Sequence, residues 1–310
     1  EIRLSLVGSE MCIRDRRALA EFVMRGRMQA TLVVVGSAIV PLLFWLSAAA
    51  GALVLLRRGL SDALGILVWA VLPAIFIWYL GDPIVLMVLL GTLALAQVLR
   101  ISASWVRVLI ACVPLGVVFT LVVNVALVET LEAYAEIFRQ ALAELPAQSA
   151  GGPSAEQVQS MQQASLVPFL SGLMTFWMVL VSVLCLALAR YWQAALYNPG
   201  GFGEEFRQIR LPVPLALALI AGVFLAPALL GDAGWAVTLV CMLPLMLAGL
   251  ALGHGLIAMK QLSSFWSIGL YVLLLVAMNL ICLLAVVDSL FDFRGRLARK
   301  SGTGPTDGEG

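Results

Sequence analysis

A few polar side chains lie inside long apolar stretches of this 310-residue sequence, and their types could do chemistry. A polar side chain in hydrocarbon costs free energy unless it is paired or hydrated, so it marks a candidate functional site. We expect Asn124, His254 and Asn279 to converge on one interior cavity and, with Asp288, to contact a ligand. His254 is the only histidine, and its alternative role is a hydrogen bond to a backbone carbonyl at a helix end.

Two carboxylates lie at the end of the last apolar stretch. Asp288 and Asp292 are four residues apart and Arg296 follows four residues later, so a continuous helix places all three on one face. We interpret this set as a ladder that fixes a helix end at the membrane surface. Paired-carboxylate catalysis would need an apolar pocket that keeps one acid protonated, and the sequence indicates none.

No motif of a known catalytic or metal site is present. The sequence contains neither HExxH nor GxSxG, and Cys112, Cys185, Cys241 and Cys282 lie singly in separate apolar stretches. We therefore expect no enzyme activity, no cofactor and no metal site. The net charge is +1 and no basic stripe is interleaved with aromatic residues, so nucleic-acid binding is not expected either.

The most distinctive segment is a glycine-rich loop. It reads YNPGGFGEEFR from Tyr197, and its candidate docking residues are Asn198, Gly200, Gly201, Phe202 and Arg207. An Asn-Pro-Gly-Gly sequence is typical of a tight turn. The loop lacks the GxxxxGK[ST] spacing that cradles phosphate. Two interpretations stay open, which are a loop that packs under a helical bundle and a loop that docks a partner protein.

The composition predicts an all-α, polytopic membrane bundle. Hydrophobic residues make up 62% of the chain and charged residues 12%, with a mean hydropathy of +1.02, whereas soluble domains contain about half and a quarter of these classes. Most of the apolar stretches have the ~20 residues that a helix needs to cross ~30 Å of hydrocarbon. The eight stretches are 29–56, 63–80, 83–99, 105–128, 166–189, 213–230, 234–257 and 266–287.

The stretches 29–56 and 213–230 do not fit a simple crossing, because both contain or adjoin prolines. The first, which contains Pro41, fits either one tilted helix or two half-helices. If both stretches are re-entrant, every Lys and Arg after residue 16 except Arg139 and Lys260 lies on one side of the membrane. Eight simple crossings would divide them evenly. Since cytoplasmic loops carry excess Lys and Arg, we prefer the re-entrant arrangement.

The remaining segments have distinct characters. Residues 1–16 resemble translated sequencing-adapter read-through, with a genuine polar leader as the alternative. The mixture of arginines and apolar residues over 17–28 predicts a basic amphipathic helix on the bilayer surface. Residues 129–165 predict an external, acidic, amphipathic helical hairpin, and residues 297–310 predict a disordered tail.

Three segments resemble the YybS-like bacterial membrane proteins, a family of unknown function. They are RALAEFVMRGRMQATLVVVGSA from Arg17, the NPGGF loop from Asn198 and VDSLFDFR from Val287. The resemblance covers residues 17–296, which we expect to form a single membrane domain. It implies a bacterial inner-membrane protein remotely related to the substrate-binding components of energy-coupling-factor vitamin transporters. The chain differs from such six-helix components in its additional apolar stretches and acidic hairpin, and the resemblance supplies no ligand residues.

Together these features predict a non-catalytic, multi-pass inner-membrane protein that binds a small solute or lipid between its helices, as one component of a transporter. Interrupted helices line the ligand sites of many transporters, which supports this hypothesis. The alternative is a membrane scaffold that docks a partner through its loops. Gly249 and Gly253 form a GxxxG pattern, which lets helices approach closely either inside the bundle or against a partner membrane protein.

Overall fold

The computed structural model describes residues 18–144, 166–263 and 265–300. These residues are helical almost throughout and contain no strand, which confirms the predicted all-α bundle. Residues 18–25 are helical, and the elements that follow are α2 (Arg27–Ile39), η1 (Pro41–Leu43), α3 (Phe44–Arg58), α4 (Leu60–Tyr79), α5 (Ile84–Ser102), α6 (Trp105–Ala126), α7 (Val128–Glu144), α9 (Leu166–Tyr197), α10 (Gly201–Arg207), α11 (Val213–Leu230), η2 (Gly231–Ala233), α12 (Gly234–Met259), α13 (Phe265–Val276), α14 (Met278–Phe291) and α15 (Phe293–Lys300).

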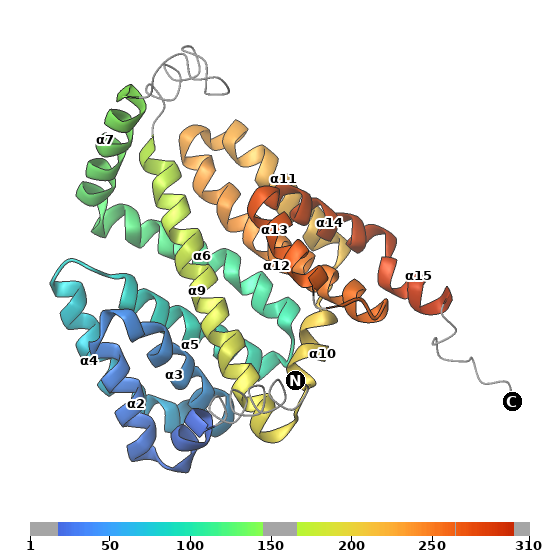
Figure 1. The fold of residues 1–310 in the computed structure, drawn as a ribbon. Coiled ribbons are helices and arrows are strands. Elements are labelled where there is room, and N and C mark those ends of the chain that lie inside the picture. Colours follow the sequence, from blue (N-terminus) through green and yellow to red (C-terminus); the bar gives the residue numbers. More distant parts are fainter. Residues whose placement is uncertain (1–17, 145–165, 264, 301–310) are drawn as a thin grey trace, which may run out of the picture.

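The long helix α9 separates two groups of helices (Figure 1). Its 32 residues give a length of about 48 Å, and it packs against α3 and α5 on one side and α12 on the other. A Cβ atom at Gly172 would lie 2.6 Å from the Cα of Ala236, so glycine is needed where α9 meets α12. In the C-terminal group α12 is apolar on all sides and is packed against α6, α9, α11 and α14.

The stretch 29–56 forms two half-helices, α2 and α3, which fold back on each other. Val40 is extended, as expected for the residue before a proline, and Pro41 begins the 3₁₀ turn η1 between them. The Ser47 hydroxyl donates to the Val34 carbonyl at 2.7 Å, and the Arg58 guanidinium donates to the Met24 carbonyl at 2.9 Å. The two ends of this hairpin therefore lie side by side, as a re-entrant segment requires.

The stretch 213–230 does not fold back on itself, so the prediction of a re-entrant segment there is wrong. It forms one continuous helix, α11, and Pro227 does not break it. The chain reverses at η2, and α12 returns antiparallel to α11, with the Thr238 hydroxyl donating to the Val223 carbonyl at 3.1 Å. A Cβ atom at Gly234 would lie 2.2 Å from the Ala226 carbonyl oxygen, so the reversal is as tight as glycine permits.

The second broken segment is instead the last apolar stretch. Helices α13 and α14 meet at Ala277 with a bend of 110°, although neither proline nor glycine marks the break. Tyr271 of α13 contacts His254 of α12, and Ser289 of α14 accepts a hydrogen bond from Arg210 at 3.1 Å. Both ends of the pair thus lie near the same end of the bundle, in the region of α10 and the C-terminal turns of α12.

Five described segments are long and apolar enough to cross a membrane, with a sixth if α13 and α14 are one span. They are α4, α5, α6, α9 and the segment Val213–Met259, which contains the antiparallel pair α11 and α12. These helices fit a multi-pass membrane protein.

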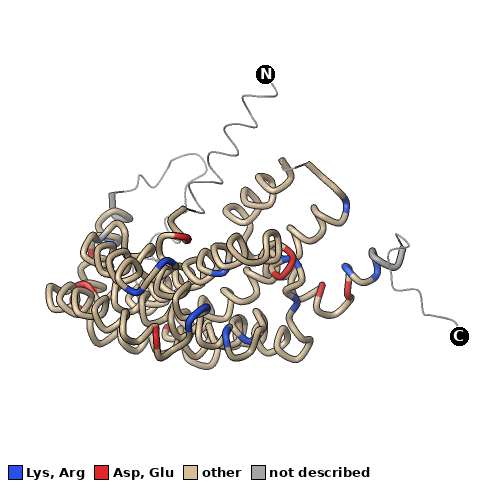
Figure 2. Tube along the Cα trace, turned by 90° about the horizontal axis from the view of Figure 1, so that it is seen from below, with Lys and Arg blue, Asp and Glu red and all other residues tan. Residues whose placement is uncertain are grey.

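The two ends of the bundle differ sharply in charge. We define the basic end as the one that contains α10, the C-termini of α3, α5, α9 and α12, and the N-termini of α4, α6 and α11. Every Lys and Arg among the described residues except Arg139 lies at this end, and Figure 2 shows them spread across the molecule as seen from below. Lys260 belongs to this set. Its predicted place on the opposite side is wrong because α11 crosses the bundle and α12 returns.

We define the acidic end as the opposite one, formed by α7, η2 and the loop between α4 and α5. Its described acidic residues are Asp82, Glu129, Glu132, Glu136, Glu144 and Asp232. Arg139 is the one described basic residue there, and it pairs with Glu136 at 3.3 Å.

The predicted flanking segments are described in part. Residues 18–25 and α7 are helical as expected, but the second helix of the hairpin expected over 129–165 lies outside the described residues. The leader 1–16 also lies outside them. Helix α15 extends to Lys300, so the disordered tail predicted from residue 297 begins too early, and residues 301–310 are not among those described.

Candidate functional site

The glycine-rich loop turns the chain from α9 into the short helix α10. Gly200 has φ +90°, a left-handed conformation that glycine adopts without strain, and Gly201 is buried at the start of α10. The Gly201 N–H donates to the Asn198 carbonyl at 3.1 Å and closes the turn. The predicted tight turn therefore exists, and it places α10 against the basic end of the bundle.

Aromatic contacts hold α10 in this position. The ring of Phe202 lies 5.9 Å from that of Trp105, 6.4 Å from Tyr191 and 6.2 Å from Phe206, measured between centroids. Phe202 is half-buried in this cluster. Of the two interpretations of the loop, this geometry matches packing under the bundle, because the side chain expected to dock a partner is occupied within the chain.

An ion pair fixes the other face of α10. Arg190 of α9 donates through Nε to Glu205 at 2.9 Å and through Nη2 to its second oxygen, and the Trp105 indole N–H donates to the same carboxylate at 3.3 Å. Burial raises the pKa of Glu205. The hydrogen bonds and charge of Arg190, together with the hydrogen bond from Trp105, lower it by more than burial raises it, so the pKa of Glu205 lies below its usual value.

A second cluster joins α10 to the end of α14. Arg294 donates to the Asp288 carboxylate at 2.8 Å and to the carbonyl oxygens of Ile209 at 2.8 Å and Arg207 at 2.5 Å. Asp288 is 2% exposed, and its Oδ1 has no hydrogen-bond partner among the described residues. Asp288 therefore neutralises Arg294 at the helix end.

The predicted ladder of Asp288, Asp292 and Arg296 is wrong. Helix α14 ends at Phe291, and Asp292 takes a left-handed conformation with φ +49°, which removes it from the face of Asp288. Asp292 instead pairs with Arg210 at 2.9 Å and accepts a hydrogen bond from the Gly295 N–H. The predicted ladder required one continuous helix, and the left-handed conformation of Asp292 ends the helix before it.

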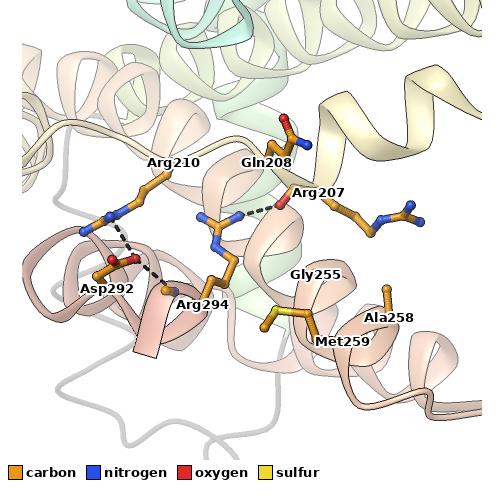
Figure 3. A pocket seen from close by; sticks show the side chains of 9 residues that line it. Arg207, Gln208, Arg210, Gly255, Ala258, Met259, Asp292 and Arg294 are labelled. Atoms are coloured by element: carbon orange, nitrogen blue, oxygen red, sulfur yellow. Dashed lines mark hydrogen bonds and ion pairs between the residues drawn. The ribbon is translucent and has the colours of Figure 1, made fainter. Parts of the chain in front are cut away.

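Arg210, Asp292 and Arg294 line a cavity of about 510 Å³, which Figure 3 shows. Its lining residues come from α10 and the following loop, α12, the junction of α14 with α15, and α15 itself. They are Arg207, Gln208, Arg210, Gly255, Ala258, Met259, Asp292, Arg294 and Gly295. The guanidinium of Arg207 points away from Asp292 and Arg294 in Figure 3. It makes no hydrogen bond or ion pair with any residue that the structure describes.

A second cavity of about 500 Å³ adjoins the first, because Arg207 and Ala258 line both. Its polar lining includes Arg207, His254, Ser267 and Tyr271, and most of the remaining wall is apolar. His254 Nε2 lies 3.0 Å from the Tyr271 hydroxyl, and its ring packs edge-on against Phe206 at 6.0 Å. His254 is thus bonded to a side chain of α13 and not to the backbone carbonyl suggested as its alternative partner.

The expectation that Asn124, His254 and Asn279 share one cavity is wrong. Asn124 lines a cavity of about 470 Å³ between α6, α7, α9 and α12, and Asn279 lines one of about 480 Å³ between α11, α12 and α14. Both asparagines are exposed on the sides of the bundle. The two asparagines lie on helices that pack against different neighbours. The position of a residue along an apolar stretch does not indicate which neighbours its helix will have.

The GxxxG pattern is used inside the chain. A Cβ atom at Gly249 would lie 2.3 Å from the Ile281 carbonyl oxygen of α14, and one at Gly253 would lie 2.6 Å from the Leu270 side chain of α13. The face that was open to a partner membrane protein is therefore covered by the broken pair.

Sequence reasoning found Arg207 as part of the loop but missed Arg210 as a site residue, and it placed Arg294 only in the C-terminal segment. No group of three His, Cys, Asp or Glu residues that could hold a metal ion occurs within the described ranges.

A scan against protein-family models found no match for this chain. Searches of curated proteins and of solved structures likewise found none. The resemblance to YybS-like proteins therefore stays a prediction.

Proposed function

We propose that this chain is a non-catalytic, multi-pass protein of a bacterial inner membrane that binds a small amphiphilic solute or lipid between its helices, as a component of a transporter. The observation that carries the proposal is the pair of adjoining cavities at the basic end, each near 500 Å³, which share the unpaired Arg207. Ligand pockets of a few hundred Å³ with mostly apolar walls and few polar groups are typical of small-molecule sites.

The surrounding architecture supports this proposal. The second cavity lies between the continuous helices α9 and α12 and the broken element α13. Broken helices beside a cavity are a recurrent feature of transporters, because their free backbone groups and ends can face a ligand. The excess of Lys and Arg at the basic end favours a cytoplasmic location for that end.

Mass spectrometry of the purified protein tests the proposal. The protein would be extracted in a mild non-ionic detergent, and co-purifying small molecules and proteins would be identified together. A solute or lipid retained in stoichiometric amount supports a binding function. An empty bundle accompanied by a stoichiometric protein partner would contradict it.

A scaffold function is the second candidate, and the exposed face of α7 favours it. Tyr134, Ile137 and Phe138 are 56%, 61% and 43% exposed, whereas Leu131 and Ala135 pack inward. Loss of a co-purifying partner on changing Ile137→Ser, with the bundle still empty of ligand, would select this function over the first.

A further inference from the structure

The charges that line the cleft do not balance. We define the cleft as the two adjoining cavities that share Arg207 and Ala258. Arg294 is neutralised by Asp288, and Arg210 is neutralised by Asp292. Arg207 is half-buried between the two cavities and has no ion-pair partner among the described residues. One positive charge is therefore available to a ligand.

The other half-buried arginines at the basic end have partners within the described residues. Arg190 pairs with Glu205 and Arg58 donates to the Met24 carbonyl, while Arg210 and Arg294 are paired as described above. A guanidinium that is partly removed from water favours an anion that accepts two parallel hydrogen bonds, such as a phosphate or carboxylate.

The position of the cleft selects the ligand class. Gly255 lines the first cavity one turn before α12 ends at Met259, so the cleft lies at the edge of the apolar segment. Phospholipid phosphates lie at this depth when a helix crosses a bilayer. Leu184, Phe202 and Ile257 give the second cavity an apolar wall, which suits hydrocarbon and not a fully hydrated metabolite.

We propose that the cleft binds the phosphodiester of an anionic phospholipid, with the phosphate on Arg207 and the glycerol and first acyl carbons against the apolar wall of the second cavity. This inference deepens the proposed function and rests on it. A phosphodiester carries one negative charge, which matches the single unbalanced guanidinium. Ser267 and Tyr271 line the same cavity and supply hydroxyl groups near the ester oxygens.

Titration of the intact protein with phosphatidylglycerol, followed by native mass spectrometry, tests the inference. Arg207→Gln should weaken phosphatidylglycerol binding by about tenfold or more, because a hydrogen-bonded charge pair contributes about 1.5–3 kcal/mol. Arg207→Lys keeps the charge but not the fork geometry and should bind with intermediate affinity. The matched control is Arg296→Gln, which removes an exposed charge from the same end outside the cavity lining and should bind as the wild type does.

A second variant tests the cavity independently of charge. Ala258→Trp adds bulk to the wall that both cavities share, so it should also reduce phosphatidylglycerol binding while every arginine stays in place. Unchanged binding in both Arg207→Gln and Ala258→Trp would overturn the site, even if the wild type retains a ligand and the broader binding function stands.

Glycerol phosphate and inorganic phosphate identify the source of the anion. The inference expects neither to displace phosphatidylglycerol at millimolar concentration, because they lack the apolar part. Displacement that depends on Arg207 would show that a soluble phosphate ester is the ligand and would overturn the lipid assignment. Equal binding of phosphatidylcholine, whose net charge is zero, would overturn the requirement for an anionic lipid.

Discussion

Arginine side chains at the basic end bind the backbone carbonyls that helices leave unpaired at their C-termini. Arg294 donates to the Arg207 carbonyl at the end of α10, and Arg210 donates to the Ser289 carbonyl in the last turn of α14. The last carbonyls of a helix have no intrahelical donor and carry partial negative charge, so a cation there both hydrogen-bonds and complements the helix dipole. These arginines are structural, whereas the half-buried Arg207 makes no such bond within the described residues.

The buried pair of Asp288 and Arg294 should contribute much more to stability than the outer pair of Asp292 and Arg210. Asp288→Asn leaves Arg294 buried with its charge uncompensated, and we expect a loss of about 3 kcal/mol in the free energy of unfolding. Asp292→Asn is the matched control. Its ion pair is more than one third exposed on both sides, so its loss should cost below about 1 kcal/mol. Thermal or denaturant unfolding in detergent measures both, and equal losses would refute this account.

The ion pair of Glu205 predicts a pH dependence of stability with a definite sign. Because the folded-state pKa of Glu205 is lowered below its usual value of 4.5, its contribution is complete above that value and is lost as the pH falls through the lowered pKa. Glu205→Gln should therefore be less stable than the wild type at pH 7, and this difference should shrink towards pH 3. Unfolding curves across this range check it, and a difference that grows on acidification would exclude the pair as its cause.

At the scale of elements, close backbone contacts determine how the broken pair packs on α12. A methyl group at Gly249 would meet the Ile281 backbone of α14, which cannot move without displacing the helix. Pro41 acts differently, since it forces the reversal between α2 and α3 through its own chain geometry.

Gly249→Ala should destabilise the protein by about 1–3 kcal/mol, because overpacking at a backbone contact forces α14 away from α12. Gly269→Ala in α13 is the matched control, since a Cβ atom there meets nothing within 4 Å. That control should be neutral or slightly stabilising, because alanine favours a helix more than glycine does. Thermal unfolding compares the two variants, and equal effects would show that the contact between α12 and α14 is looser than described.

The whole molecule is polarised between its basic and acidic ends, and this predicts its orientation. We expect the basic end in the cytoplasm, which places Asp232 on the external face and Lys260 inside. The arrangement predicted from the charge count alone, which we call the charge-only arrangement, has a re-entrant stretch at 213–230. It places Asp232 inside and Lys260 outside.

Single cysteines at these two positions test the orientation. In a background without native cysteines, a membrane-impermeant thiol reagent applied to intact cells should label Asp232→Cys and should label Lys260→Cys only after the membrane is opened. Both positions are exposed, so access does not limit the reaction. Labelling of Lys260→Cys alone in intact cells would restore the charge-only arrangement.

The sequence by itself determined the helical class, most helix positions and the tight turn at Gly200, because these depend on apolar length and on local backbone preferences. The reversal at Pro41 was among its alternatives for the same reason. The break at Ala277 was not foreseen, since no local residue type marks it, and the charge count assigned the second re-entrant segment to 213–230 instead.

The composition of the candidate site was decided only by the tertiary structure. Arg294 lies more than 80 residues after Arg207 and Arg210 in the sequence. Which of the three keeps a free charge depends on where Asp288 and Asp292 lie in the folded chain. Asn124 and Asn279 are both polar residues inside apolar stretches of the sequence, yet they line separate cavities. Hydropathy shows how apolar each helix is, but it does not show how the helices are rotated and paired. Rotation and pairing decide which side chains converge, and they are determined by close contacts such as that of Gly249 with Ile281.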